Sequence, residues 1–172
     1  MAWYAAYGLR SVSLRYFNVA GASERYGERH DPETHLIPNI LRSARGGPEL
    51  TIFGDDYPTA DGTAIRDYIH VLDLADAHIE ALELSAQMPP GQEVCNLGSG
   101  SGFSVKQVLD TASQVVGRPI PHHYGARRAG DPPVLVASND RAQELLGWEP
   151  ERGTLAEMIG SAWHVLEQGR GR

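Results

Sequence analysis

The chain has 172 residues, of which 41% are hydrophobic and 22% charged, so it is long enough for one domain with a sizeable core and is neither disordered nor fibrous. Its formal net charge of −7 comes without a basic block, which argues against a nucleic-acid or anionic-membrane partner. No apolar run approaches the length of a membrane span, and Cys95 is the only cysteine, so we expect no disulfide within the chain and a cytoplasmic location.

The first quarter of the chain predicts a helix end, a strand, a loop and a short helix. The opening residues form the last turns of a helix that stops at Gly8, a usual left-handed position. Residues 11–17 alternate apolar and polar side chains and predict a strand. Residues 19–34 are polar and contain glycine, which is typical of a loop that covers a site. Residues 36–45 predict a short helix.

The next segment predicts a strand over 50–53, turns over 54–63 and then a long helix that ends at the Met88-Pro89-Pro90-Gly91 stretch. The apolar residues expected to face the core of this helix are Ile65, Ile69, Leu72, Ile79 and Leu82. The acidic residues expected to face water are Asp73, Asp76, Glu80 and Glu83.

The stretch NLGSGSGFSV, residues 96–105, follows a short apolar run and precedes a helical pattern. Ser104 begins a capping box with Gln107, so the helix start is well defined. A phosphate-binding turn would have the same strand, glycine turn and helix, but Phe103 stands where the third glycine of G-x-G-x-x-G should be. From these residues alone, the turn is either a phosphate cradle or a strand-to-helix turn that lines a site.

The last part of the chain predicts a strand over 134–137, a helix over 139–146 closed by Gly147, and a final helix capped by Thr154 and Glu157. Strands that alternate with helices indicate an α/β domain with a partly parallel sheet.

Four stretches together resemble the UDP-glucose 4-epimerases, a family of extended short-chain dehydrogenases/reductases: residues 14–22, 50–79, 96–105 and 127–138. The resemblance implies an NAD-binding Rossmann-type fold with a smaller substrate-binding domain. It covers essentially the whole chain but only the C-terminal half of the family's length, so we expect the N-terminal NAD-binding half to be absent.

The resemblance also implies a division of residues 1–172 into two parts. Residual Rossmann elements are expected at about 1–22 and 64–103. The sugar-nucleotide-binding part is expected at about 23–63 and 104–172.

The family is an isomerase family in which NAD oxidises C4 of the hexose while a tyrosine, activated by a lysine four residues later, removes the hydroxyl proton. Lys106 is the only lysine, and the position four residues before it is Gly102. We therefore expect the catalytic tyrosine, lysine and serine upstream of Met1, and an inactive isolated chain. The glycine turn at 96–105 then corresponds to a late strand-to-helix turn of the family.

By the family's pattern, Phe17 closes on the nicotinamide side of NAD and Asn18 binds near the substrate diphosphate. The alternative for Phe17 is core packing. His35 and Leu36 match positions that contact the nucleotide, although the family often has asparagine where His35 stands.

The remaining predicted contacts lie later in the chain. The strand Thr51, Ile52 and Phe53 is expected to lie along the uracil ring. Arg66 and Arg128 are expected to bind the diphosphate, because a guanidinium matches phosphate oxygens.

Two further positions complete the predicted pocket. Asp131 should accept hydrogen bonds from ribose hydroxyls, its alternative being a turn residue. Leu135 falls where the family varies a wall of the hexose pocket, and a side chain smaller than tyrosine there is expected to admit an N-acetyl group.

His30, Asp31, Glu33 and His35 lie close in sequence, but their spacing fits no helical H-x-x-x-H face and the family uses no metal, so we expect none. The expected partners are a UDP-sugar and, for the full-length enzyme, a second copy in a homodimer. Two alternatives remain open: a non-catalytic sugar-nucleotide-binding module, and a related enzyme acting on UDP-N-acetylglucosamine, UDP-glucuronate or UDP-xylose.

Overall fold

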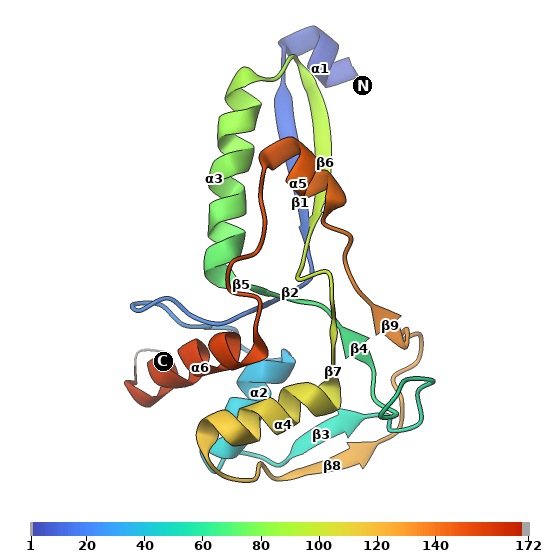
Figure 1. Ribbon diagram of the computed structural model, residues 1–172, viewed down its shortest axis with the longest axis vertical. Coiled ribbons are helices and arrows are strands. Elements are labelled where there is room, and N and C mark those ends of the chain that lie inside the picture. Colours follow the sequence, from blue (N-terminus) through green and yellow to red (C-terminus); the bar gives the residue numbers. More distant parts are fainter. Residues whose placement is uncertain (1, 170–172) are drawn as a thin grey trace.

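The computed structural model describes residues 2–169, which form an elongated α/β molecule with two lobes (Figure 1). In the upper lobe of that view, strands β1 (Arg10–Tyr16) and β6 (Gly91–Leu97) pair in parallel, and the short helix α1 (Ala2–Tyr7) lies at their far end. Helices α3 (Val71–Gln87) and α5 (Asp140–Leu146) pack against these two strands.

The lower lobe contains three helices, α2 (Leu36–Ala44), α4 (Val105–Val116) and α6 (Leu155–Glu167). Beside them, β3 (Leu50–Phe53) pairs in parallel with β8 (His122–Gly125). Strand β4 (Ile65–Arg66) lies between β7 (Phe103–Ser104), which is antiparallel, and β9 (Val134–Leu135), which is parallel. The parallel pair β2 (Asn18–Ala20) and β5 (Tyr68–His70) connects the two lobes.

Each lobe has its own buried cluster of hydrophobic side chains. In the lower lobe α2, α4 and α6 enclose a core whose fully buried members include Ile40, Val108 and Ile159. In the upper lobe α3, α5 and β6 enclose a second core around Ala77, Leu97 and Ala142. Helix α5 therefore packs with the strands of the upper lobe, although the division expected from the sequence assigned it to the sugar-nucleotide-binding part.

The predicted helix ends are confirmed where the signal is local. Both capping boxes are present: the hydroxyls of Ser104 and Thr154 each accept a hydrogen bond from the backbone N–H of the third helical residue, and their own backbone N–H groups donate to the side chain of that residue. Gly8 and Gly147 adopt φ of +64°, the left-handed conformation expected of glycine at a helix stop.

The predicted start of the long helix at Ile65 is wrong. Residues 65–66 and 68–70 are short strands, and the helix begins at Val71 after His70, whose ring accepts a hydrogen bond from Leu72 N–H at 3.1 Å. Ile65 and Ile69 are four residues apart, a separation that also fits a helix, but each lies in a strand that pairs with distant parts of the chain.

The predicted faces of α3 are also partly wrong. Asp73 was expected to face water, yet it is only 1% exposed and pairs with the Arg152 guanidinium at 2.6 Å. Ile79 and Leu82 were expected in the core, yet they are 56% and 71% exposed. The helix instead buries its small residues Ala77 and Ala81 together with Leu74.

Besides β4 and β5, three strands were not predicted: β2, β7 and β8. Strand β8 contains two histidines and follows a proline-rich stretch, so its sequence has no apolar alternation. Strand β2 occupies residues 18–20, where the loop was expected to begin. The strand expected over 134–137 is shorter and ends at Leu135, while the strand over 50–53 is confirmed.

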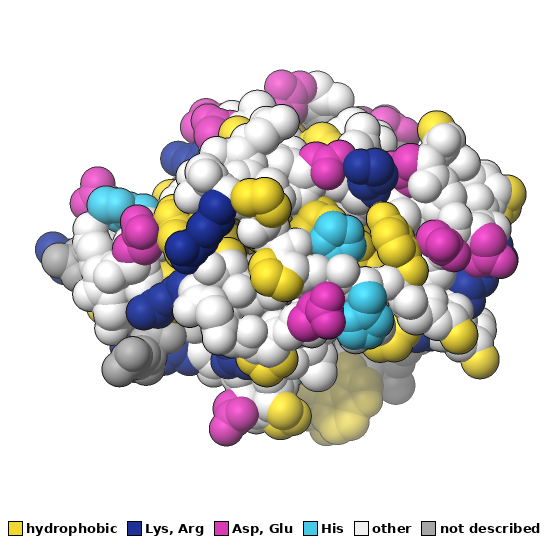
Figure 2. Space-filling view, turned by 90° about the horizontal axis from the view of Figure 1, so that it is seen from below, with side chains coloured by type: hydrophobic (Ala, Val, Ile, Leu, Met, Phe, Trp, Pro, Cys, Tyr) yellow, Lys and Arg dark blue, Asp and Glu magenta, His cyan; other side chains and the backbone are white. Residues whose placement is uncertain are grey.

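The face at the lower end of the molecule carries basic and acidic side chains interspersed with hydrophobic ones (Figure 2). Because its charges are mixed, this face gives an anion no extended basic surface, and binding depends on where individual arginines lie. Within the described part of the chain, no helix has the length and apolar character needed to cross a membrane.

Candidate functional site

A cleft of about 470 Å³ lies in the lower lobe, between the start of α2, strand β3, strand β4 and the loop after β8. This volume is within the range of small-molecule binding sites. Nine of the eleven residues proposed from the sequence line it: Asn18, His35, Leu36, Thr51, Ile52, Phe53, Arg66, Arg128 and Asp131. They come from segments up to 113 positions apart, so the fold brings together what the sequence pattern only suggested.

Arg66 is the most constrained cation of the cleft. One amino group of its guanidinium donates to the carbonyl oxygens of Ile65 and Pro132 at 2.8 and 2.9 Å, and the other lies 3.3 Å from a carboxylate oxygen of Asp131. The side chain of Arg66 is only 14% exposed. A fork held in this way is pre-oriented, so binding an anion costs little side-chain entropy.

Arg128 is held in a different way, on the exposed loop after β8. Its guanidinium lies 4.1 Å from the centroid of the Phe53 ring, a cation–π contact at the end of β3. Phe53 therefore contributes to the cleft through its aromatic face, which orients the arginine toward the end of the strand.

The sequence interpretation missed a third arginine, Arg42, which also lines the cleft. It lies on α2 one turn after Asn39, another lining residue, whereas Ile40 and Leu41 are buried. The available signal was the pair of polar residues three positions apart on an otherwise amphipathic helix. With Arg42, Arg66 and Arg128 against Glu49 and Asp131, the charged side chains of the cleft favour an anion.

Strand β3 forms the floor of the cleft and pairs only with β8 among the strands of residues 2–169. Its second edge therefore keeps unpaired backbone donors and acceptors. The Thr51 hydroxyl lies 3.1 Å from the His123 ring on β8, so this side chain is tied to the paired edge. A flat heterocycle beside the other edge would meet main-chain groups that can read its hydrogen-bonding pattern.

Asn18 and His35 mark two other walls of the cleft. The Asn18 side-chain amide donates to the Asp67 carbonyl oxygen at 2.8 Å, and the Asn18 backbone N–H donates to the same oxygen at 3.1 Å. His35 is the N-cap residue of α2, and its side chain makes no capping hydrogen bond. The first N–H groups of a helix lack intrahelical partners, so this end of α2 can receive an acceptor from a ligand.

Two of the proposed residues do not line the cleft. Phe17 is half-buried between β1 and β2, where its backbone N–H donates to the Leu97 carbonyl at 3.2 Å. Leu135 is exposed on β9, in register with Arg66 on β4. Their assigned contacts with nicotinamide and hexose remain predictions.

Tyr68 is a buried tyrosine in the wall of the cleft. Burial raises its pKa to about 12, and the nearby Arg66 charge opposes this rise only partly. The phenol therefore stays protonated near neutral pH and can act as a hydrogen-bond donor but not as a general base.

The glycine turn after β6 surrounds a carboxylate of the protein itself. The fully buried Asp67 accepts hydrogen bonds from the Ser99 N–H and hydroxyl at 2.7 and 2.6 Å, from Gly100 N–H at 3.1 Å and from Ala137 N–H at 2.9 Å. A Cβ on Gly98 would lie 2.4 Å from the same carboxylate, which explains the glycine there. The turn thus binds an internal anion, so within residues 2–169 these N–H groups offer no cradle for a dinucleotide phosphate.

Comparison with known protein families gives a match over the first part of the chain. The sequence profile described as the NAD dependent epimerase/dehydratase family matches residues 1–98. A curated relative, the UDP-glucose 4-epimerase of Corynebacterium glutamicum, is 53% identical over 160 residues, which is 92% of this chain and 48% of the relative. The chain thus spans about half the length of the curated relatives it matches.

Solved structures show the same similarity in three dimensions. UDP-glucose 4-epimerase from Brucella ovis, in complex with NAD, superposes with a TM-score of 0.89 and 46% identity over 95% of this chain and 51% of that chain. The enzyme from Bifidobacterium longum, in complex with NAD+ and UDP, gives a TM-score of 0.89 and 36% identity over 99% of this chain and 52% of that chain. These similarities confirm the predicted α/β, Rossmann-like fold class.

Proposed function

Because the chain belongs to the NAD dependent epimerase/dehydratase family, we propose that it is the C-terminal, sugar-nucleotide-binding half of a UDP-glucose 4-epimerase, an isomerase that interconverts UDP-glucose and UDP-galactose. The observation that carries the proposal is the cleft, in which nine residues chosen for UDP-sugar contacts meet beside a third arginine. In this family NAD supplies a reversible oxidation at C4 of the hexose.

The uridine diphosphate part of a UDP-sugar has a counterpart for each of its groups in the cleft. The diphosphate is bound by the guanidinium groups of Arg66 and Arg128, with Arg42 adding positive charge. Asn18 lies beside the diphosphate, its side chain oriented by the Asp67 carbonyl. Asp131, already 3.3 Å from Arg66, accepts hydrogen bonds from the ribose hydroxyls.

The uracil lies along β3, where the free edge of Thr51, Ile52 and Phe53 reads its donors and acceptors. His35 and Leu36 complete this end of the cleft through the start of α2. Because main-chain groups recognise the uracil, the strand needs no charged side chain at this position, although it borders the ligand.

The catalytic groups come from sequence N-terminal to Met1 in this proposal. No tyrosine precedes Lys106 by four residues, and Tyr68 in the cleft has a pKa too high for a base. The proposal therefore assigns the tyrosine, lysine, serine and NAD-binding glycine loop to an upstream half, with Phe17 closing on the nicotinamide. By itself the 172-residue chain turns over no substrate.

The upper lobe exposes apolar side chains, which is an argument for an upstream half that packs against this lobe. Trp3, Tyr7, Tyr16, Ile79 and Leu82 expose more than half of their surface there, on α1, β1 and α3. Exposed apolar side chains in such number mark a surface that another structure covers. The proposal keeps the expected boundaries, a Rossmann remnant at about 1–22 and 64–103 and a nucleotide-binding part in the remainder, except that α5 packs with the upper lobe. It also includes a cytoplasmic, homodimeric full-length enzyme.

A test of the activity uses the chain with and without its upstream coding sequence. The extended protein is expected to contain G-x-x-G-x-x-G and Y-x-x-x-K in frame, to bind NAD and to epimerise UDP-galactose, whereas the 172-residue chain binds UDP but yields no product. Formation of product by the 172-residue chain alone would contradict the assignment of the catalytic groups to an upstream half. An upstream sequence without either motif would favour a non-catalytic sugar-nucleotide-binding module.

Leu135 gives the substrate range a specific test. Because leucine is smaller than tyrosine, the proposal is that the extended enzyme also accepts UDP-N-acetylglucosamine. Leu135→Tyr should lower turnover of the acetylated sugar while sparing UDP-glucose. Equal turnover of the acetylated sugar by both proteins, or none by either, would end this assignment.

A further inference from the structure

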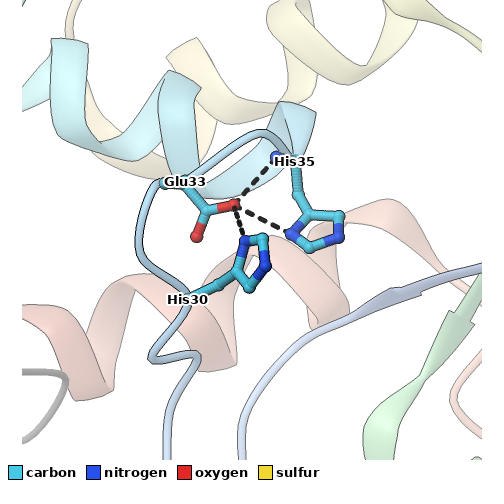
Figure 3. Close-up of side chains that lie close together, drawn as sticks. All are labelled: His30, Glu33 and His35. Atoms are coloured by element: carbon cyan, nitrogen blue, oxygen red, sulfur yellow. Dashed lines mark hydrogen bonds and ion pairs between the residues drawn. The ribbon is translucent and has the colours of Figure 1, made fainter.

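Three side chains of the loop between β2 and α2 converge on one point beside the cleft, and one of them, His35, also lines the cleft. His30, Glu33 and His35 point toward one another (Figure 3). A carboxylate oxygen of Glu33 lies 2.8 Å from Nδ1 of His35 and 3.9 Å from Nδ1 of His30. All three possible ligand atoms lie within 4.8 Å of one another.

We propose that His30, Glu33 and His35 form a binding site for a divalent transition metal of the zinc class. The sequence argued against a metal because the spacing fits no helical motif and because the family uses none. An irregular loop nevertheless brings three of the four grouped residues together without a helical motif. Asp31, which the sequence grouped with them, is not among the three converging side chains.

The ligand chemistry selects the type of metal. Two imidazole nitrogens and one carboxylate oxygen are a usual zinc donor set, with a fourth position left for water. Calcium and magnesium prefer all-oxygen sites, so these ions should bind weakly. With bonds of about 2.0 to 2.2 Å, ligand atoms around tetrahedral zinc lie about 3.3 to 3.6 Å apart. The observed separations of 2.8 and 3.9 Å bracket this range, so small side-chain rotations suffice.

The burial of Glu33 favours a cation here, in addition to the hydrogen bond that its carboxylate accepts from the His35 N–H. Its side chain is 2% exposed, whereas those of His30 and His35 are 48% and 51% exposed. A carboxylate withdrawn from water is costly unless positive charge or hydrogen bonds compensate it. A metal held between this carboxylate and two accessible imidazoles would supply that charge, and it could enter from the exposed histidine side.

The supporting contacts already orient the carboxylate. The Glu33 oxygen accepts a hydrogen bond from the His35 backbone N–H at 2.8 Å, and the Glu33 carbonyl accepts one from the Asn39 side chain at 3.4 Å. Such surrounding hydrogen bonds tune metal sites. Because His35 also lines the cleft, a bound metal would fix the loop against one wall of that cleft.

The test titrates the 172-residue chain with Zn²⁺ alone by calorimetry and with Co²⁺ alone by visible absorption. We expect one ion per chain and Co²⁺ bands of a low-symmetry nitrogen and oxygen site. Glu33→Gln and His30→Ala should each weaken Zn²⁺ binding by about tenfold or more, which is about 1.4 kcal/mol or more. Mg²⁺ should not compete.

His164→Ala is the matched control, because His164 is an exposed histidine on α6 that contacts Gln168 and no acidic side chain of the described residues. It should bind Zn²⁺ as the unaltered chain does, and circular dichroism checks that every variant is folded. Absence of Zn²⁺ binding, or equal binding by the unaltered chain and the Glu33→Gln and His30→Ala variants, would overturn the proposal and leave a hydrogen-bonded histidine–glutamate cluster. The readout is metal binding itself, so it does not depend on the proposed function.

Discussion

Replacing Asp67 by asparagine tests whether the glycine turn depends on an internal anion. The carboxylate accepts four hydrogen bonds, two on each oxygen, at full burial. Asparagine has one oxygen and an NH₂ group that would face donors. If the NH₂ group faces Ser99, the Ser99 hydroxyl can rotate to accept from it, and only the Ser99 backbone N–H loses its acceptor. If the NH₂ group faces Gly100 and Ala137, the backbone N–H groups of both residues lose their acceptor.

Hydrogen bonds to a charged group contribute about 1.5 to 3 kcal/mol each, so Asp67→Asn should lower the free energy of unfolding by about 2 to 6 kcal/mol. This is a large part of the usual stability of a domain. Urea denaturation followed by circular dichroism measures the loss. The control is Asp110→Asn, which removes only an exposed pair with Lys106 and should cost less than about 1 kcal/mol. Equal stability of the two variants would refute the reasoning.

Three further predictions concern the contacts that join the lobes. Burial lowers the pKa of His70, with the Asp73 charge opposing, so the unfolded chain takes up a proton near pH 6.5 that the folded chain resists. Stability should therefore fall as pH drops through about 6.5 and level off below the folded pKa, and His70→Asn should lessen this fall in thermal melts. Gly21→Ala should lower the melting temperature, because φ is +84° and its Cβ would lie 2.5 Å from the His70 ring; an unchanged melt would show that the ring moves freely. Asp73→Asn weakens the pairing with Arg152 and should cost about 1 to 3 kcal/mol in urea, a loss that should shrink when Arg152 is also replaced.

Features set by neighbouring residues were predictable from the sequence. The capping boxes at Ser104 and Thr154 depend on residues three positions later, so the pattern and the structure agree. The glycine stops at Gly8 and Gly147 need only a left-handed φ. The gathering of the cleft residues followed from a family resemblance, since periodicity alone gives Arg66 no reason to meet Arg128.

Features set by distant contacts were not predictable in this way. Strand β8 exists because β3 offers it a parallel partner some 70 positions earlier in the chain, and of its four residues only Tyr124 is a strong strand former. The buried Asp73 is neutralised by Arg152, 79 positions away. An acidic residue on a helix is normally solvated, so only the tertiary structure shows that this one is paired.

The most direct test of the account is UDP binding to the 172-residue chain, measured by calorimetry for the unaltered protein, Arg128→Ala and the Arg66→Ala/Arg128→Ala pair. Arg141→Ala serves as control, because this exposed arginine on α5 pairs with Glu93 and does not line the cleft. The account predicts that the unaltered and control chains bind UDP equally, that Arg128→Ala binds about tenfold or more weakly, and that the double variant binds more weakly still. Folded chains that all bind UDP with the same affinity, or an unaltered chain that does not bind it, would contradict the assignment of this cleft to a uridine diphosphate.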